Sequence, residues 1–163
     1  MGAARAVAVA RAVRSELEAV PDGEIVDTLG TAKILRPGKD ATILALALMV
    51  PRALEAAERL HKEHGIDCEV IDVRSLVPLD TQTILSSIAK THHCFSVEEN
   101  PRLCGWGAEI MSIIADEAFY ELDGPLVRIT TPHVPLPAAD ILEDMILPTV
   151  DRIVERIRTT LKA

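Results

Sequence analysis

Four short apolar segments, each followed by a stretch with helical periodicity, constrain the fold of this chain more than any other feature. In order along the chain they are ATILALA, CEVIDV, HCFSVEE and LVRITT. Segments of this length and composition are typical of strands that are buried on both faces. Strand–helix repeats require right-handed crossovers, which place helices on both faces of a mostly parallel sheet. The pattern therefore predicts an α/β fold, a three-layer α/β/α sandwich.

A fifth predicted strand, AKILR at residues 32–36, comes before these four. The turn PGKD joins it to ATILALA. Such a short connection leaves no room for a crossover helix, so this strand is expected to run antiparallel, either beside ATILALA or at some remove from it. The predicted sheet is thus five-stranded and mixed, with one antiparallel strand.

Capping and turn residues set the expected limits of the helices. Gly65 is placed to end the first helix, and Asp80 is placed to cap the start of the next. Residues 105–122 (GWGAEIMSIIADEAFYEL) read as one long helix, and Pro148 opens a final amphipathic helix. The segment PHVPLP at residues 132–137 cannot continue a sheet because proline has no amide hydrogen to donate.

Composition narrows the class of protein and of partner. Hydrophobic residues make up 48% of the chain but aromatic residues only 2%, so the core must consist of Val, Ile, Leu and Ala. This composition suits buried strands covered by helices. The 17 Lys and Arg residues are outnumbered by 25 Asp and Glu residues, which gives a net charge of -8. Such a surface repels phosphate backbones, so nucleic acid is not an expected partner, whereas a basic partner would be attracted.

Three cysteines without a CxxC pair favour free thiols in a reducing compartment. The most apolar stretch, ATILALALMV, is too short to cross a membrane and is bounded by Asp40 and Pro51. We therefore expect a cytoplasmic protein with no membrane contact. Residues 1–20 are rich in Ala and Arg and are expected to form a leading helix or an unstructured arm, but a transit-peptide remnant, and hence the mitochondrial matrix, is the alternative.

No complete catalytic, cofactor or metal site is evident from the residues themselves. The glycine pattern of a dinucleotide site is absent after ATILALA, and no phosphate-binding P-loop motif occurs. Gly105 and Gly107 precede a helix whose free amides could attract an anion, although glycines that let the loop turn tightly onto the sheet explain them as well. His92 and His93 are adjacent, so in a strand they would point to opposite faces and could not share a metal ion.

Taken in order, four longer segments resemble one known family. They are LGTAKILRPGKDATILALALMVPRALEAAERL, CEVIDVRSLVPLDTQTIL, VEENPRLCGWGAEI and LDGPLVRITTPHVPLPAADILEDMILPTVDRIV. This run resembles the C-terminal domain of the β subunit of thiamine-diphosphate-dependent 2-oxo acid dehydrogenases, and its tail resembles the pyruvate type more than the branched-chain type. The resemblance implies one transketolase C-terminal-like domain over residues 21–163, whose sheet has five strands, one of them antiparallel.

The resemblance also implies what this chain lacks. In that family, another domain of the β subunit activates thiamine diphosphate, and the α subunit holds the diphosphate and its magnesium ion. This sequence has no GDG metal-diphosphate motif. We therefore expect no catalytic, cofactor-binding or metal-binding residues here and no turnover by the chain alone. The chain departs from the family pattern at Ala47, Leu48, Cys104 and Ala138, which weakens any inferred ligand contact at the Gly105 loop and any inferred active-site contact at Ala138.

The role implied by the resemblance is assembly. The expected partners are an α subunit, a second β subunit and the dihydrolipoyl acyltransferase, and the residues implied in acyltransferase docking are Asp123 with Glu121 and the C-terminal Ala163. A different class of function is a stand-alone regulatory or small-ligand-binding α/β domain that uses the helix start at Gly105 and Gly107. A receiver-type enzyme is not favoured, because ATILALALM ends without acidic residues.

Overall fold

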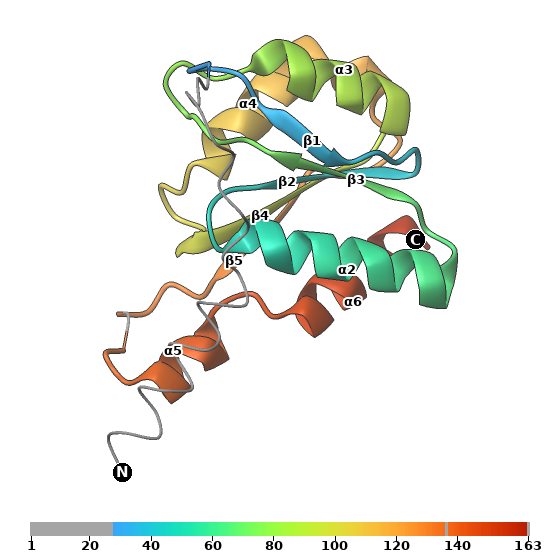
Figure 1. Cartoon of the computed structure of the whole chain (residues 1–163). Helices are drawn as coiled ribbons and strands as arrows, with labels where there is room; N and C mark the ends of the chain where they lie inside the picture. Colours follow the sequence, from blue (N-terminus) through green and yellow to red (C-terminus); the bar gives the residue numbers. More distant parts are fainter. Residues whose placement is uncertain (1–27, 136, 163) are drawn as a thin grey trace, which may run out of the picture.

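The protein forms a five-stranded mixed sheet covered by helices on both faces (Figure 1). The computed structural model describes residues 28–135 and 137–162, so the predicted arm at residues 1–20 lies outside the described residues. The strands, in their order across the sheet, are β1 (Lys33–Arg36), β3 (Cys68–Asp72), β2 (Ala41–Ala45), β4 (Cys94–Pro101) and β5 (Val127–Thr131). Only the pairing of β1 with β3 is antiparallel. The prediction of a mixed sheet is confirmed, and β1 lies at some remove from β2 because β3 separates them.

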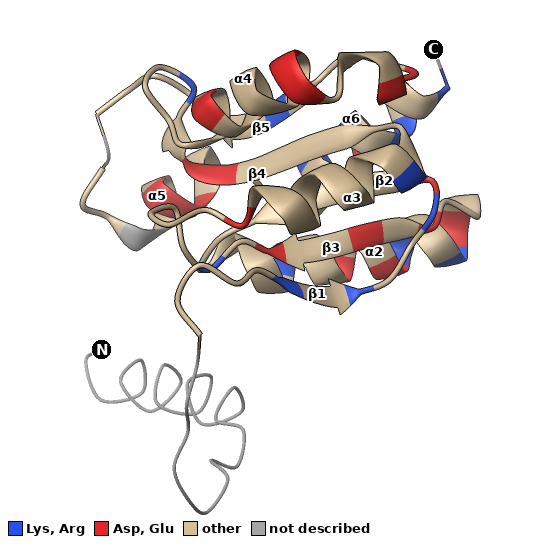
Figure 2. Cartoon of the chain, turned by 90° about the horizontal axis from the view of Figure 1, so that it is seen from above, with Lys and Arg blue, Asp and Glu red and all other residues tan. Residues whose placement is uncertain are grey.

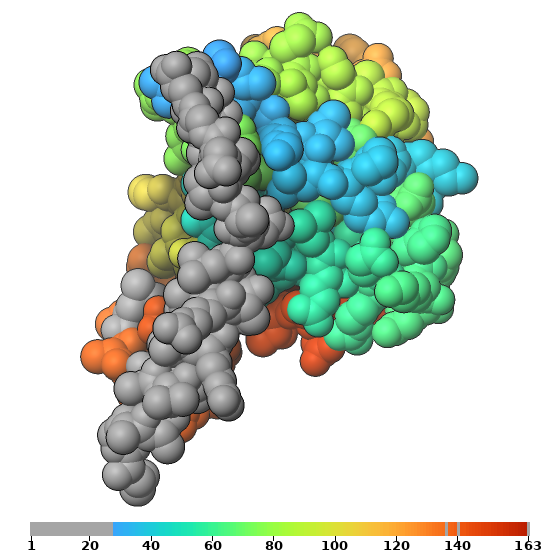
Figure 3. All heavy atoms as spheres, viewed as in Figure 1, coloured from blue at the N-terminus to red at the C-terminus, as the bar shows by residue number. Residues whose placement is uncertain are grey.

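Two helices cover each face of the sheet, which confirms the predicted three layers (Figure 1). α2 (Met49–His64) and α6 (Val150–Leu161) lie on one face, and α3 (Thr81–Thr91) and α4 (Gly107–Glu117) lie on the other. In the space-filling view, β1 lies at the surface between α3 and α2 (Figure 3). No helix of the described residues is long and apolar enough to span a membrane.

The central strand β2 shows how the two cores are built. All five of its residues are buried. Ile43 joins the apolar cluster beneath α2 and α6, whereas its neighbour Leu44 joins the cluster beneath α3 and α4. Successive side chains of a strand point to opposite faces, so a run that is apolar throughout can supply both cores at once.

Two of the predicted helix limits are confirmed. Gly65 follows α2 with φ 69°, a left-handed conformation that glycine adopts without steric cost. The carboxylate of Asp80 accepts a hydrogen bond from the backbone N–H of Thr83 at 3.0 Å, as expected of an N-cap. Asp80 also accepts a bond from the backbone N–H of Ala32, so the same side chain ties the start of α3 to the chain just before β1.

The prediction of one long helix over residues 105–122 is wrong. α4 ends at Glu117, and a separate 3₁₀ turn, η1, spans Phe119–Glu121. The reason is that Phe119 and Tyr120 are exposed, so a continued helix would bury no further apolar face. A short helix that the sequence did not predict, α5 (Asp140–Ile146), follows the proline-rich segment.

Candidate functional site

The order of the strands places one crevice at the centre of the sheet. The chain leaves β2 for β3 on one side, and α3 then returns it to β4 on the other side of β2. The strand order therefore reverses between β2 and β4. In open α/β sheets, ligands bind in the crevice outside the carboxyl ends of the strands at this switch point.

Three loops at the carboxyl ends of the strands contain residues in a left-handed backbone conformation. Ala47 after β2 has φ 51°, Arg74 after β3 has φ 58°, and Cys104 after β4 has φ 57°. Residues other than glycine adopt this conformation at a cost of about 1–2 kcal/mol each. Backbone strain of this kind is concentrated at functional sites, so this edge of the sheet is a candidate functional site.

A buried ion pair lies at the same edge of the sheet. The Glu98 side chain on β4 is completely buried, and Arg128 on β5 donates two hydrogen bonds to it, from Nε to Oε1 at 2.8 Å and from Nη2 to Oε2 at 2.7 Å. Ser96 and Asn100 also donate to the Glu98 carboxylate, at 2.6 and 2.9 Å. The carboxylate is therefore fully hydrogen-bonded despite its burial.

These contacts decide the charge state of Glu98. Burial alone would raise the pKa of this carboxyl, but the hydrogen bonds from Arg128, Ser96, Asn100 and the backbone of Gly107 outweigh burial and lower the pKa below its ordinary value. Glu98 is therefore ionised at neutral pH. In turn, the hydrogen bonds to Glu98 raise the pKa of Arg128.

The two glycines singled out by the sequence lie against this ion pair. A Cβ atom at Gly107 would lie 2.2 Å from Oε1 of Glu98, and one at Gly105 would lie 1.9 Å from the amide nitrogen of Asn100. Only glycine allows such a close approach. The Gly107 N–H donates to Glu98 Oε2 at 3.1 Å, so a carboxylate of the protein itself is bound at the start of α4, and an external anion would have to compete with it.

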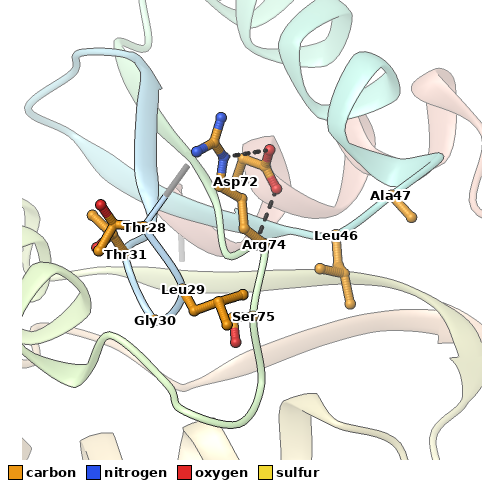
Figure 4. A pocket seen from close by; sticks show the side chains of 9 residues that line it. All are labelled: Thr28, Leu29, Gly30, Thr31, Leu46, Ala47, Asp72, Arg74 and Ser75. Atoms are coloured by element: carbon orange, nitrogen blue, oxygen red, sulfur yellow. Dashed lines mark hydrogen bonds and ion pairs between the residues drawn. The ribbon is translucent and has the colours of Figure 1, made fainter. Parts of the chain in front are cut away.

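Two cavities adjoin each other at the switch point. The larger cavity, of about 360 Å³, lies at the ends of β2 and β3, and its acidic residue is Asp72 (Figure 4). The Asp72 carboxylate accepts a hydrogen bond from the backbone N–H of Arg74 and pairs with the Arg74 guanidinium. The smaller, of about 200 Å³, lies at the ends of β2 and β4 and contains Glu99. Leu46 and Ala47 line both cavities.

The residues predicted for docking lie elsewhere. Asp123 and Glu121 are exposed and follow α4 near the amino end of β4, so they do not share a site with Gly105 and Gly107. Two hydrogen bonds with His92, the residue that follows α3, hold their segment. The Asp123 N–H donates to the His92 carbonyl at 3.0 Å, and the His92 ring Nδ1 lies 2.7 Å from the Glu121 carbonyl. Because that carbonyl can only accept, Nδ1 carries the proton.

Ala163, the third predicted docking residue, lies outside the described residues. The end of α6 that leads to it can be placed, because Thr160 of α6 and Pro125 line one small cavity. The last turn of α6 therefore lies beside the segment that carries Asp123.

Residues 116–123 present an exposed group that the sequence analysis recognised only in part. The Phe119 and Tyr120 rings, 61% and 98% exposed, meet edge to face with their centroids 5.4 Å apart. Four exposed carboxylates flank the rings, and α4 itself has no Lys or Arg (Figure 2). We call this group the acidic–aromatic surface; it comprises Asp116, Glu117, Phe119, Tyr120, Glu121 and Asp123. The sequence pattern does not predict its aromatic part, because it places Phe119 and Tyr120 within one long helix over residues 105–122.

The described residues hold no group of three His, Cys, Asp or Glu side chains placed to bind a metal ion.

A buried polar network lies beneath α3, and the pattern of apolar residues in the sequence does not predict it. Ser87 donates to the buried carboxylate of Glu69 at 2.6 Å, and the Thr42 hydroxyl lies 2.5 Å from that of Ser87. Lys90 also donates to Glu69, and this ion pair closes the network at the surface.

Comparison with known proteins agrees with this architecture. The family profile for "Transketolase, C-terminal domain" matches residues 30–153. The chain is 46% identical over 136 residues to the acetoin:2,6-dichlorophenolindophenol oxidoreductase subunit beta of Bacillus subtilis (strain 168). It is 45% identical over 139 residues to the mitochondrial pyruvate dehydrogenase E1 component subunit beta of Ascaris suum. These matches cover 83% and 85% of the chain.

A solved structure described as "Split gene transketolase, inactive beta4 tetramer" superposes with a TM-score of 0.71 at 27% identity and covers 85% of this chain and 44% of that one. The chain spans only 39% and 38% of the length of the Bacillus and Ascaris relatives, so it corresponds to one part of such proteins. The profile match extends over most of the chain, and the sheet has the one antiparallel strand that the sequence analysis predicts. The chain belongs to the transketolase C-terminal domain family.

Proposed function

We propose that this chain is the C-terminal domain of the β subunit of a 2-oxo acid dehydrogenase, of the pyruvate type, and that it acts in assembly. It pairs with a second β subunit, contacts an α subunit and docks a dihydrolipoyl acyltransferase. Identity of about 45% to pyruvate dehydrogenase β subunits supports the assignment to the β subunit. The relatives include both bacterial and mitochondrial proteins.

The observation that carries the docking role is the acidic–aromatic surface. Four carboxylates surround two exposed rings, and the segment from Asp116 to Asp123 contains no Lys or Arg. Aromatic anchors ringed by charge are typical of protein interfaces, and acidic groups steer a basic partner towards them. The acidic–aromatic surface therefore suits a partner whose contact surface is rich in Lys and Arg.

Thiamine diphosphate and magnesium serve the assembled enzyme in this proposal, and the residues of this chain do not fit them. The N-terminus of α4, the natural place for a diphosphate, already binds the ionised carboxylate of Glu98. A diphosphate brought there would be repelled by that charge. We therefore assign the cofactor to parts of the enzyme outside this chain.

A second candidate is the β subunit of an acetoin oxidoreductase, which the 46% identity to the Bacillus protein favours. The two candidates share the assembly role and differ in the substrate of the whole enzyme. Assaying the assembled enzyme with pyruvate and with acetoin distinguishes them.

The docking role is tested by reversing one charge. Asp123 is exposed and makes no side-chain hydrogen bond or ion pair among the described residues, so Asp123→Lys should leave the fold intact. Calorimetric titration with the basic peripheral domain of the acyltransferase should show weaker binding, by about tenfold or more at low salt. Glu55→Lys, an equally exposed change on α2 at the other face of the sheet, is the matched control. Unchanged affinity of Asp123→Lys would remove this residue from the interface.

A further inference from the structure

The 200 Å³ cavity between the carboxyl ends of β2 and β4 is a candidate binding site, and its lining residues indicate the chemical class of the ligand. It is lined by Leu46, Ala47, Glu99, Asn100 and Trp106. It lies at the switch point of the sheet, the position where open α/β sheets bind ligands. Its volume is below the 300 Å³ or so of the smallest pockets for drug-sized molecules, so it suits a group of the size of one side chain.

Glu99 is the chemically distinctive residue of this cavity. Its Oε1 atom is buried and accepts no hydrogen bond from the described residues, and Glu99 forms no ion pair with them. Its neighbour Glu98, by contrast, is fully bonded and neutralised by Arg128. Among the described residues that line this cavity, the carboxylate without a partner is therefore that of Glu99. A buried carboxylate oxygen without a donor is energetically unfavourable, and a cation bound beside it would supply the missing donors.

Asn100 cannot supply the missing donor. Its amide nitrogen has two hydrogens, which it donates to Glu98 at 2.9 Å and to the Pro101 carbonyl at 3.0 Å. The side-chain carbonyl of Asn100 is what remains, and it can only accept. Glu99 and Asn100 thus both present acceptors, and the group that suits them must donate several hydrogen bonds.

We propose that this cavity binds a guanidinium or ammonium group carried on a short apolar stem. Glu99 is its counter-ion, and the carbonyl of Asn100 accepts a further hydrogen bond. Leu46 and Ala47 contact the stem, and the Trp106 ring offers the aromatic surface on which cations bind favourably. This site lies at the opposite end of the strands from the acidic–aromatic surface, so it does not depend on the docking role.

Trp106 lines the cavity and is the single tryptophan of the chain, so its indole N–H signal reports ligand binding there. Titration of the whole chain with propylguanidinium should shift the one indole N–H signal in a nitrogen–proton spectrum, with saturation. Propylurea, a neutral molecule of nearly the same shape, should not shift it. High salt should weaken the effect.

Two variants connect the binding to Glu99. Glu99→Gln and Glu99→Ala should each weaken propylguanidinium binding by about tenfold or more, since a hydrogen bond to a charged group is lost. Glu109→Gln removes an exposed charge nearby on α4 and is expected to leave binding unchanged. Circular dichroism checks that each variant is folded. An indole signal that does not respond, that responds equally to propylurea, or that responds equally in both Glu99 variants would overturn the proposal.

The source of the cation is resolved by two further ligands. Free L-arginine and N-acetyl-L-arginine amide share a guanidinium, but only the second resembles an arginine within a polypeptide. Binding of N-acetyl-L-arginine amide, with or without binding of free arginine, assigns the site to an arginine side chain of a partner protein. Binding of free arginine alone assigns it to a small molecule, and binding of neither, with propylguanidinium bound, assigns it to a small cation other than arginine.

Discussion

Arg128 on β5 donates two parallel hydrogen bonds to the buried carboxylate of Glu98 on β4, at 2.8 and 2.7 Å. A third donor of the same guanidinium, Nη1, bonds the carbonyl of Arg102 at 2.8 Å. One side chain thus joins two neighbouring strands and the loop that leads to α4. Since the Gly107 N–H also bonds Glu98, the position of α4 depends on this pair as well.

Replacing Arg128 by Met is expected to be severely destabilising. The change leaves Glu98 buried and ionised without its counter-ion, which typically costs about 3–5 kcal/mol of unfolding free energy. Urea unfolding followed by circular dichroism measures the loss. Arg158→Met is the matched control, because the Nε and Nη2 atoms of Arg158 also bond both carboxylate oxygens of a glutamate, the exposed Glu155 on α6. Exposed pairs of this kind contribute at most about 1 kcal/mol. Equal losses in the two variants would contradict a structural role for the buried pair.

The same pair predicts how stability responds to acid. The pKa of Glu98 is lower in the folded chain than its ordinary value of 4.5, so the folded state favours the ionised form. Its contribution to stability is present above pH 4.5 or so and is lost as the pH falls through the lowered pKa of the folded state. Glu98→Gln should therefore be less stable at pH 7, and the difference from the original chain should shrink as the pH falls from 5 towards 3. Urea unfolding over this range checks it, and a difference that stays constant with pH would count against the assignment.

The strands and the antiparallel β1 could be predicted from the sequence because local patterns encode them. An apolar run such as ATILALA marks a buried strand whatever the rest of the chain does, and the short turn before it rules out a crossover. Gly65 and Asp80 act on backbone groups within a few residues of themselves, so their roles could be predicted as well. The end of α4 could not, because it depends on where Phe119 and Tyr120 lie relative to the core.

The contacts of the candidate site could not be predicted for a related reason. Glu98 and Arg128 are 30 residues apart in the chain, and nothing in the sequence selects Arg128 from the other basic residues. Glu98 and Glu99 are adjacent glutamates at the end of the predicted strand HCFSVEE, and the sequence pattern does not distinguish them. Only the fold separates them, because alternate side chains of a strand enter different surroundings: one meets Arg128 and the other enters the cavity.

The polar network beneath α3 gives a third prediction. Ser87→Ala removes the hydroxyl that donates to Glu69 and accepts from Thr42, which leaves buried polar atoms without partners. The expected cost is about 1–3 kcal/mol of unfolding free energy. Ser86→Ala, one position earlier and exposed, is the control and should change stability by no more than about 0.5 kcal/mol. Equal effects in urea unfolding would show that the network does not stabilise α3.

The chain alone is expected to decarboxylate no 2-oxo acid, even with thiamine diphosphate and magnesium present. The reason is that the start of α4, the best anion-binding position at this edge of the sheet, is taken by Glu98. The measurement is carbon dioxide release from pyruvate by the pure chain, with a complete dehydrogenase as the positive control. Release above the rate without protein would refute the proposal that the cofactor belongs to other parts of the enzyme.

Self-association is the last expectation, and the short helix α5 offers a way to test it. Ile141 and Met145 lie one helical turn apart, and each is 74% exposed. Leu142 beside them is 51% exposed. Apolar side chains grouped in this way are typical of a surface that another chain covers, and two copies would most simply pair about a two-fold axis.

Sedimentation of the chain over a range of concentrations should therefore show a dimer or a larger species. Ile141→Glu should shift the equilibrium towards the monomer, because pairing would bury an unpaired charge. Leu103→Glu, which changes a similarly exposed apolar residue in the loop before α4, is the control and should leave the association unchanged. If the unmodified chain stays monomeric at the highest concentration, α5 is covered by a different chain. If Ile141→Glu associates as strongly as the unmodified chain, pairing uses another surface.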